Sequence, residues 1–153
     1  MTDQEIKDRL IRMRAEIDSI ISSVDKDIED EENIKSIILD YFGVSREGFE
    51  SAQRVQSTRV IPRDFYFFFG KALLNISLER LGKNAGDKNH ATALHGINNI
   101  INWLEYKDKE ITGHYDYLYL VFERRGYDMS LIPKFVEEQK AKQRSSLKNL
   151  KRA

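Results

Sequence analysis

Apolar residues in the first 24 positions recur at alternating steps of four and three. They form one stripe along a helix with charged residues between them: Ile6, Leu10, Met13, Ile17, Ile20 and Val24. This a/d heptad spacing predicts an amphipathic helix over residues 3–24. Such a stripe packs either against its own domain or against a second copy in a homodimer through residues 3–24, and the pattern leaves both interpretations open.

The rest of the chain also follows helical rather than strand periodicity. An acidic break over Asp25–Glu32 is predicted to precede a helix over Ile34–Phe42, with Gly43 at its C-terminal cap. Residues 51–61 lack apolar periodicity and predict a loop, after which Pro62 suits the first turn of a helix running to about residue 75. Further helices are predicted over 77–82, with Ser77 as cap, and over 90–104 and 111–124.

A run of five aromatic residues, Phe65 to Phe69, occupies the helix that begins at Pro62. Successive helical residues point in all directions around the axis, so this run predicts a helix covered on several sides. A base-stacking platform is the less favoured interpretation.

Charge divides the chain into three predicted parts, although its 25 basic and 25 acidic residues balance overall. Residues 1–32 form an acidic amphipathic helix with net charge −6, and residues 33–124 a domain with net charge +1. Residues 125–153 form a basic tail with net charge +5, which is expected to fray. Within the domain, residues 52–90 carry a local charge of +4, which would attract a polyanion.

Several functional classes are not supported by the sequence. The chain has no cysteine, which excludes disulfides and thiolate metal sites, and its three histidines do not form a ligand pair. No apolar run approaches a membrane span, and we expect a cytoplasmic protein. No Gly-x-x-x-x-Gly-Lys-Ser/Thr loop occurs, so neither nucleotide binding nor any other cofactor is expected. No nucleophile–base pair stands out, and we expect a protein that is not an enzyme.

Two short helices joined by a glycine-containing turn, 77–82 and 90–104, have helix-turn-helix proportions. The second begins within Gly86-Asp-Lys-Asn-His-Ala-Thr-Ala-Leu-His95. This segment resembles the signature of the C-terminal DNA-binding domain of the bacterial replication initiator DnaA, Gly-Gly-Arg-Asp-His-Thr-Thr-Val-Leu-His. Four further patches agree in the same register: Ile38-Leu-Asp-Tyr-Phe-Gly-Val-Ser45, Ile61-Pro-Arg63 with Lys71, Asn75-Ile-Ser-Leu-Glu-Arg-Leu-Gly82, and Asp108-Lys-Glu-Ile-Thr-Gly-His-Tyr115.

The resemblance covers residues 33–124 and implies an all-α, Trp-repressor-like helix-turn-helix bundle, here with an added N-terminal amphipathic helix. It implies that a recognition helix presents its first turn to base edges in the major groove of double-stranded DNA. Phosphate contacts are expected beside it, from basic side chains and from amides at a helix start. The candidate base-contacting residues are Lys88, Asn89, His90, Ala91 and Thr92. The candidate phosphate-contacting residues are Arg63, Lys71, Ser77 and Leu78, with Arg54 or Arg59 in the preceding loop.

Three positions depart from the family pattern and keep an alternative open. Val55 stands where the family sends an arginine into the minor groove, and Asp64 and Glu79 place acids beside expected phosphate contacts. The alternative is a protein-interaction module that retains the fold with weakened or lost DNA binding. The leading hypothesis is a non-enzymatic DNA-binding protein: a replication or transcription regulator, or an accessory factor of a mobile element.

Overall fold

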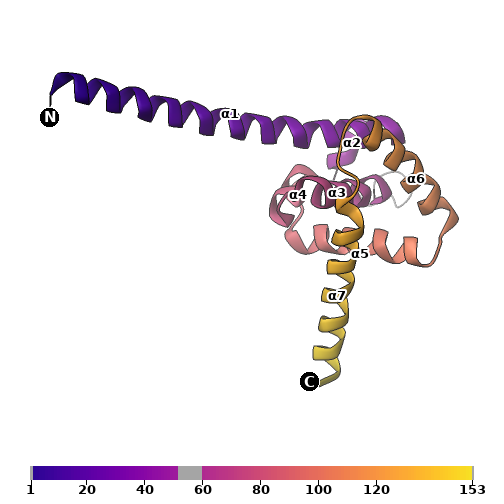
Figure 1. Ribbon diagram of the computed structural model, residues 1–153. Helices are drawn as coiled ribbons and strands as arrows, with labels where there is room; N and C mark the ends of the chain where they lie inside the picture. The colour runs from indigo at the N-terminus through magenta and orange to yellow at the C-terminus, as the bar shows by residue number, and fades with distance from the viewer. Residues whose placement is uncertain (1, 52–59, 153) are drawn as a thin grey trace. The chain divides into compact units, whose positions relative to one another are not determined.

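The computed structural model describes residues 2–51 and 60–152, which form seven α-helices and no strand (Figure 1). The predicted all-α class is therefore confirmed. The helices are α1 (Asp3–Phe42), α2 (Arg46–Glu50), α3 (Ile61–Leu74), α4 (Leu78–Asn84), α5 (His90–Glu105), α6 (Lys109–Arg124) and α7 (Leu131–Arg152). Two compact units result, residues 1–33 and 34–153. The three-part division of the chain drawn from its charge remains a prediction.

Helix α1 begins with a capping box. The Thr2 hydroxyl accepts from the Glu5 amide at 3.2 Å, while the Glu5 carboxylate accepts from the Thr2 amide at 3.3 Å. From there α1 runs without interruption to Phe42, so the predicted break over Asp25–Glu32 is wrong. The segment contains no glycine or proline, and a run of charges alone forms a solvated helix face rather than a helix end.

The end of α1 lies in the second unit and follows the predicted cap. Gly43 adopts a left-handed φ of 65°, and the Val44 amide donates to the Leu39 carbonyl at 3.1 Å. This is the Schellman arrangement, for which glycine is the favoured residue. Just before it, the apolar side chains of the last two turns of α1 enter the core: Ile34, Ile37, Ile38 and Leu39.

The segment after α1 holds one element that the periodicity did not predict. Ser45 caps the short helix α2, and its hydroxyl accepts from the Gly48 amide at 3.0 Å. The predicted loop over 51–61 falls mostly outside the described residues, but Ile61 already belongs to α3. Pro62 stands in the first turn of α3, as predicted.

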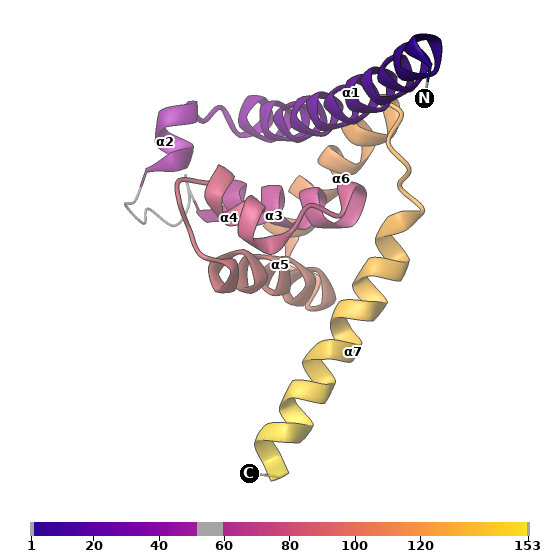
Figure 2. The same ribbon diagram turned by 90° about the vertical axis from the view of Figure 1, so that its left-hand side faces the viewer.

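Helix α3 is the centre of the second unit, and Figure 2 shows it among α4, α5 and α6. The five side chains from Phe65 to Phe69 are all 0 % exposed, which confirms that this helix is covered on several sides. Each part of the cover comes from a different helix. Ring neighbours of α3 are Phe42 of α1, Phe49 of α2, Tyr115 and Phe122 of α6, and Phe135 of α7.

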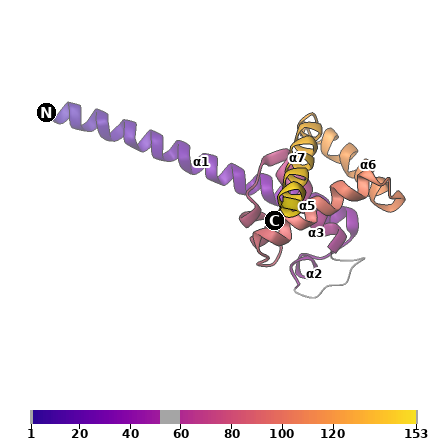
Figure 3. The ribbon, with the colours of Figure 1, turned by 90° about the horizontal axis from the view of Figure 1, so that it is seen from below.

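The C-terminal segment is a helix rather than a fraying tail, so that expectation is wrong. Residues 131–152 form α7, which runs toward the viewer in Figure 3. Its buried or half-buried residues recur at helical spacing: Ile132, Phe135, Val136, Gln139, Lys140 and Gln143. The Phe135 ring lies 5.7 Å from that of Phe68, so this face of α7 packs against α3. Among the described residues, no helix combines the length and apolarity that crossing a bilayer requires.

Candidate nucleic-acid interface

Helices α4 and α5 are held together by a turn that passes close over α4. The predicted Ser77 cap is present: its hydroxyl accepts from the Arg80 amide at 3.2 Å. The Lys88 amide donates to the Gly82 carbonyl at 2.8 Å, and a Cβ on Gly82 would lie 2.3 Å from the Lys88 carbonyl oxygen. Only glycine allows this approach. Gly82 thus sets how closely the start of α5 lies against α4.

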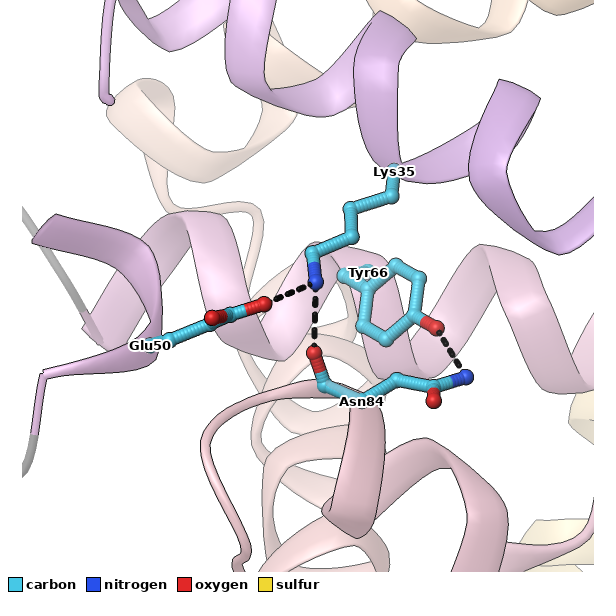
Figure 4. Close-up of polar contacts among 4 residues, drawn as sticks. All are labelled: Lys35, Glu50, Tyr66 and Asn84. Atoms are coloured by element: carbon cyan, nitrogen blue, oxygen red, sulfur yellow. Dashed lines mark hydrogen bonds and ion pairs between the residues drawn. The ribbon is translucent and has the colours of Figure 1, made fainter. Parts of the chain in front are cut away.

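A polar cluster fixes the other end of α4 (Figure 4). The Lys35 ammonium of α1 donates to the Asn84 carbonyl at 2.7 Å and pairs with the Glu50 carboxylate of α2 at 2.5 Å. The Asn84 amide donates to the Tyr66 hydroxyl of α3 at 3.2 Å. Lys35 is 3 % exposed, so it satisfies a helix-terminal carbonyl within the protein interior. Four helices meet at the base of the turn.

This polar cluster is not predictable from the sequence pattern. Lys35 lies 15 residues from Glu50 and 49 from Asn84, so no local motif marks the three. A lysine next to Ile34 and close to the apolar run Ile37 to Leu39 was the one available signal.

The five residues from Lys88 to Thr92 form one continuous segment at the start of α5, as the sequence predicted. His90 and Ala91 are exposed, while Lys88 and Thr92 are half-buried. Asn89 is the N-cap, and its Oδ1 accepts from the Thr92 amide at 2.9 Å and from the Thr92 hydroxyl at 3.0 Å. Both lone pairs of that oxygen are engaged, so bidentate pairing of Asn89 with adenine would compete with the cap.

The predicted phosphate-contacting residues are placed unequally. Ser77 is exposed and Leu78 half-buried at the start of α4. Arg63 is 7 % exposed. Lys71 is half-buried, and both burial and the nearby Lys142 of α7 lower the pKa of its ammonium. Arg54 and Arg59 lie outside the described residues. The contacts themselves remain predictions.

A groove of about 800 Å³ separates the recognition helix candidate from α7. Leu94 and Asn98 line it from α5, and Lys142 and Gln143 from α7. Lys142 of α7 therefore lies across the groove from the first turns of α5. It is also close enough to Lys71 for the two positive charges to repel each other.

Comparison with known proteins assigns the domain. The family model described as the bacterial DnaA protein helix-turn-helix matches residues 31–100. These residues are a DnaA-type helix-turn-helix domain. Similar proteins include the chromosomal replication initiator protein DnaA of Wolbachia pipientis wMel, 27 % identical over 78 residues, and that of Anaplasma marginale (strain St. Maries), 31 % identical over 72 residues.

The two alignments cover 51 % and 47 % of this chain but 17 % and 15 % of the relatives. The chain therefore spans about a sixth of the length of the curated relatives it matches. No solved structure matches it. The family match contains α2 to α4 with the last turns of α1 and most of α5, whereas α6 and α7 follow it.

One of the two acids that the sequence placed beside phosphate contacts is buried. Asp64 was expected beside a phosphate contact, but it is 7 % exposed and its side chain hydrogen-bonds Asn99 of α5. A Cβ on Gly96 would lie 2.5 Å from Oδ1 of Asp64. The Asp64 carboxyl therefore occupies the space that a side chain at position 96 would fill. Burial raises the pKa of Asp64 to about 6, and Asn99, Arg63 and His95 oppose the rise. Glu79, by contrast, is exposed in the first turn of α4.

Proposed function

We propose that this chain is a non-enzymatic, cytoplasmic protein that binds double-stranded DNA with the start of α5 in the major groove. The observation that carries the proposal is the DnaA-type match to residues 31–100, which includes α4, most of α5 and the whole segment Lys88–Thr92. Helix-turn-helix proteins read bases with the first turn of the second helix. In this chain that turn exposes His90 and Ala91.

The residues of this turn divide the work by their chemistry. The His90 ring donates to a base or a phosphate, and the Ala91 methyl meets a thymine methyl. Lys88 supplies a positive charge next to the DNA backbone. The hydrogen bond between Asn89 and Thr92 stabilises the start of α5, which carries His90 and Ala91. Lys71, with Lys142 nearby, gives a pair of positive charges that supports a phosphate position.

The curated relatives are named as chromosomal replication initiators, which favours a role at replication origins or at related sites elsewhere. A regulator of replication or transcription and an accessory factor of a mobile element both fit this chemistry. The alternative of a protein-interaction module loses one of its arguments, because Asp64 does not stand on the surface. It keeps the exposed Glu79 and also Val55, which lies outside the described residues.

The test is titration of labelled duplexes, one with a DnaA-box-like sequence and one scrambled, by fluorescence anisotropy at two salt concentrations. We expect His90→Ala to weaken binding to the preferred duplex by about 1–3 kcal/mol and to reduce discrimination between the two. Lys88→Ala should weaken both and lower the slope of log K against log salt by about 1. The matched control is Lys109→Ala, an exposed lysine of α6, which should change neither.

Two outcomes would end the proposal: no binding to either duplex at low salt, or wild-type behaviour of both the His90 and the Lys88 variants. Retained folding is checked for each variant by its urea unfolding midpoint, so that lost binding is not confused with lost structure.

The proposal also includes self-association. Along residues 3–24 the six apolar residues of the heptad stripe are all exposed in the described chain. A homodimer through these residues would cover them. Equilibrium sedimentation of the full chain would show twice the monomer mass, and removal of the stripe by Ile17→Asp would return the monomer.

A further inference from the structure

Residues 3–28 of α1 carry nine large apolar side chains that are exposed in the described chain. All are between 43 and 66 % exposed: Ile6, Leu10, Ile11, Met13, Ile17, Ile20, Ile21, Val24 and Ile28. Six of them follow the alternating steps of four and three that bring a and d positions to one seam. Large exposed apolar surfaces of this kind mark interaction sites.

The stripe is symmetric about its own midpoint, between Met13 and Ile17. If a second helix runs in the opposite direction with its residue 15 opposite residue 15, every stripe residue meets another. Ile6 then faces Val24 of the second copy, Leu10 faces Ile20, and Met13 faces Ile17. An antiparallel coiled coil pairs a with d in this way, so this register leaves no apolar stripe position without a partner.

Charge along the helix distinguishes this direction from the parallel one. Residues 7–14 hold four basic side chains and one acidic, while residues 16–23 hold Glu16 and Asp18 and no basic side chain. Antiparallel pairing places the positive stretch of each copy beside the negative stretch of the other. Parallel pairing in register places each stretch beside its own kind.

The positions that flank the seam do not distinguish the two directions. In a parallel pair, Arg9 would face Arg14 of the second copy, and symmetry repeats this repulsion on the other side. In the antiparallel pair, the like-charged contacts are one Arg14 pair and one Glu16 pair at the centre. Each direction therefore has two like-charged flanking contacts, and the preference for the antiparallel direction rests on the charge of the longer stretches.

We propose that residues 6–24 of α1 pair antiparallel with the same residues of a second copy of this chain, with Leu10 opposite Ile20. This inference rests on the homodimer proposed above and adds to it the direction and register of the two helices.

The chain contains no cysteine, so introduced thiols report on this register alone. We would prepare the full chain as Leu10→Cys and, with a short tag that changes its mass, as Ile20→Cys. Each is oxidised mildly alone and after mixing, and the products are separated on non-reducing gels. We expect the mixture to give the disulfide-linked species of intermediate mass, and each variant alone to stay unlinked.

The expected result follows from helix geometry. In the antiparallel register the two copies of residue 10 are ten residues apart along the axis, or about 15 Å at 1.5 Å per residue. A disulfide requires Cα atoms within about 7 Å. Ser22→Cys, on the face opposite the stripe, is the matched control and gives the background of collisional cross-linking.

The failures of the two proposals are distinguishable. Self-linking of Leu10→Cys without linking in the mixture would show a parallel dimer and overturn the antiparallel register, while the homodimer stands. A monomer mass in sedimentation, with no linking above the Ser22→Cys background, would overturn both.

Discussion

Helices α1 and α3 are both rich in large apolar residues, yet residues 3–28 of α1 expose theirs whereas α3 buries all of its aromatic side chains. In α1 six of the nine exposed apolar residues lie on one stripe with charged residues around it, so a single partner helix can cover that stripe. In α3 they succeed one another around the helix, which requires cover from several elements at once. The arrangement of apolar residues, rather than their number, predicts which helix becomes the core.

The largest effect should come from removing one ring from α3. Phe69→Ala takes away contacts with the rings of Tyr115 and Phe122, and we expect it to lower the free energy of unfolding by about 3–5 kcal/mol. Ile11→Ala in α1 should leave the unfolding midpoint of the second unit unchanged, since Ile11 is exposed and lies outside the heptad stripe. Urea unfolding followed by the near-ultraviolet signal of the aromatic core measures both. Equal losses in the two variants would contradict the contrast between the helices.

The next effect concerns the pH dependence of stability and compares Asp64 of α3 with Asp18 of α1. Burial raises the pKa of Asp64 to about 6, so the folded state holds its proton more tightly than the unfolded state does. Stability from this group is therefore fully present below about pH 4 and is lost as the pH rises through 6, by roughly 2–3 kcal/mol.

Asp64→Asn should remove that loss. The variant should match the wild type near pH 4 and be more stable than it at pH 7.5, as read from urea midpoints at the two pH values. Asp18→Asn, an exposed position in α1, should show no such divergence. A wild-type pH dependence in Asp64→Asn would show that another group is responsible.

The smallest effect compares two lysines of the same helix. Lys35→Met leaves the Asn84 carbonyl without its donor, and we expect a loss of about 1–3 kcal/mol in unfolding free energy. Lys26→Met, nine residues earlier on the exposed part of α1, should change stability by less than about 0.5 kcal/mol. If the two variants unfold alike, α1 does not change from surface helix to core helix between residues 26 and 35.

Local chemistry made much of this fold predictable. Pro62 at the start of α3, the Ser77 cap of α4 and the left-handed Gly43 after α1 each follow from the backbone preference of one residue type. The burial of the five aromatic residues followed from their succession alone. Residues Lys88–Thr92 were placed together because they are consecutive.

What the sequence did not reveal depends on distant neighbours. From the sequence, Asp64 is expected on the surface. It is buried because its carboxyl packs against Gly96 and hydrogen-bonds Asn99, which lie more than thirty residues later in the chain. Lys35 gains its role only when Glu50 and Asn84 come together. The wrong prediction of a break over Asp25–Glu32 has a different cause. A run of charged residues was interpreted as a helix breaker, although the segment contains neither glycine nor proline.

The ring contact between Phe135 and Phe68 determines which truncated fragments of this protein keep the core covered. A fragment ending at residue 100 would hold every residue that the family model recognises, yet it would lack the helices that cover two faces of α3. The rings of Phe68 and Phe69 would then meet water, and such a fragment would tend to aggregate rather than bind DNA. The family model matches residues 31–100, whereas the second compact unit continues beyond them to the C-terminal helix, so recombinant fragments should extend through at least Gln139.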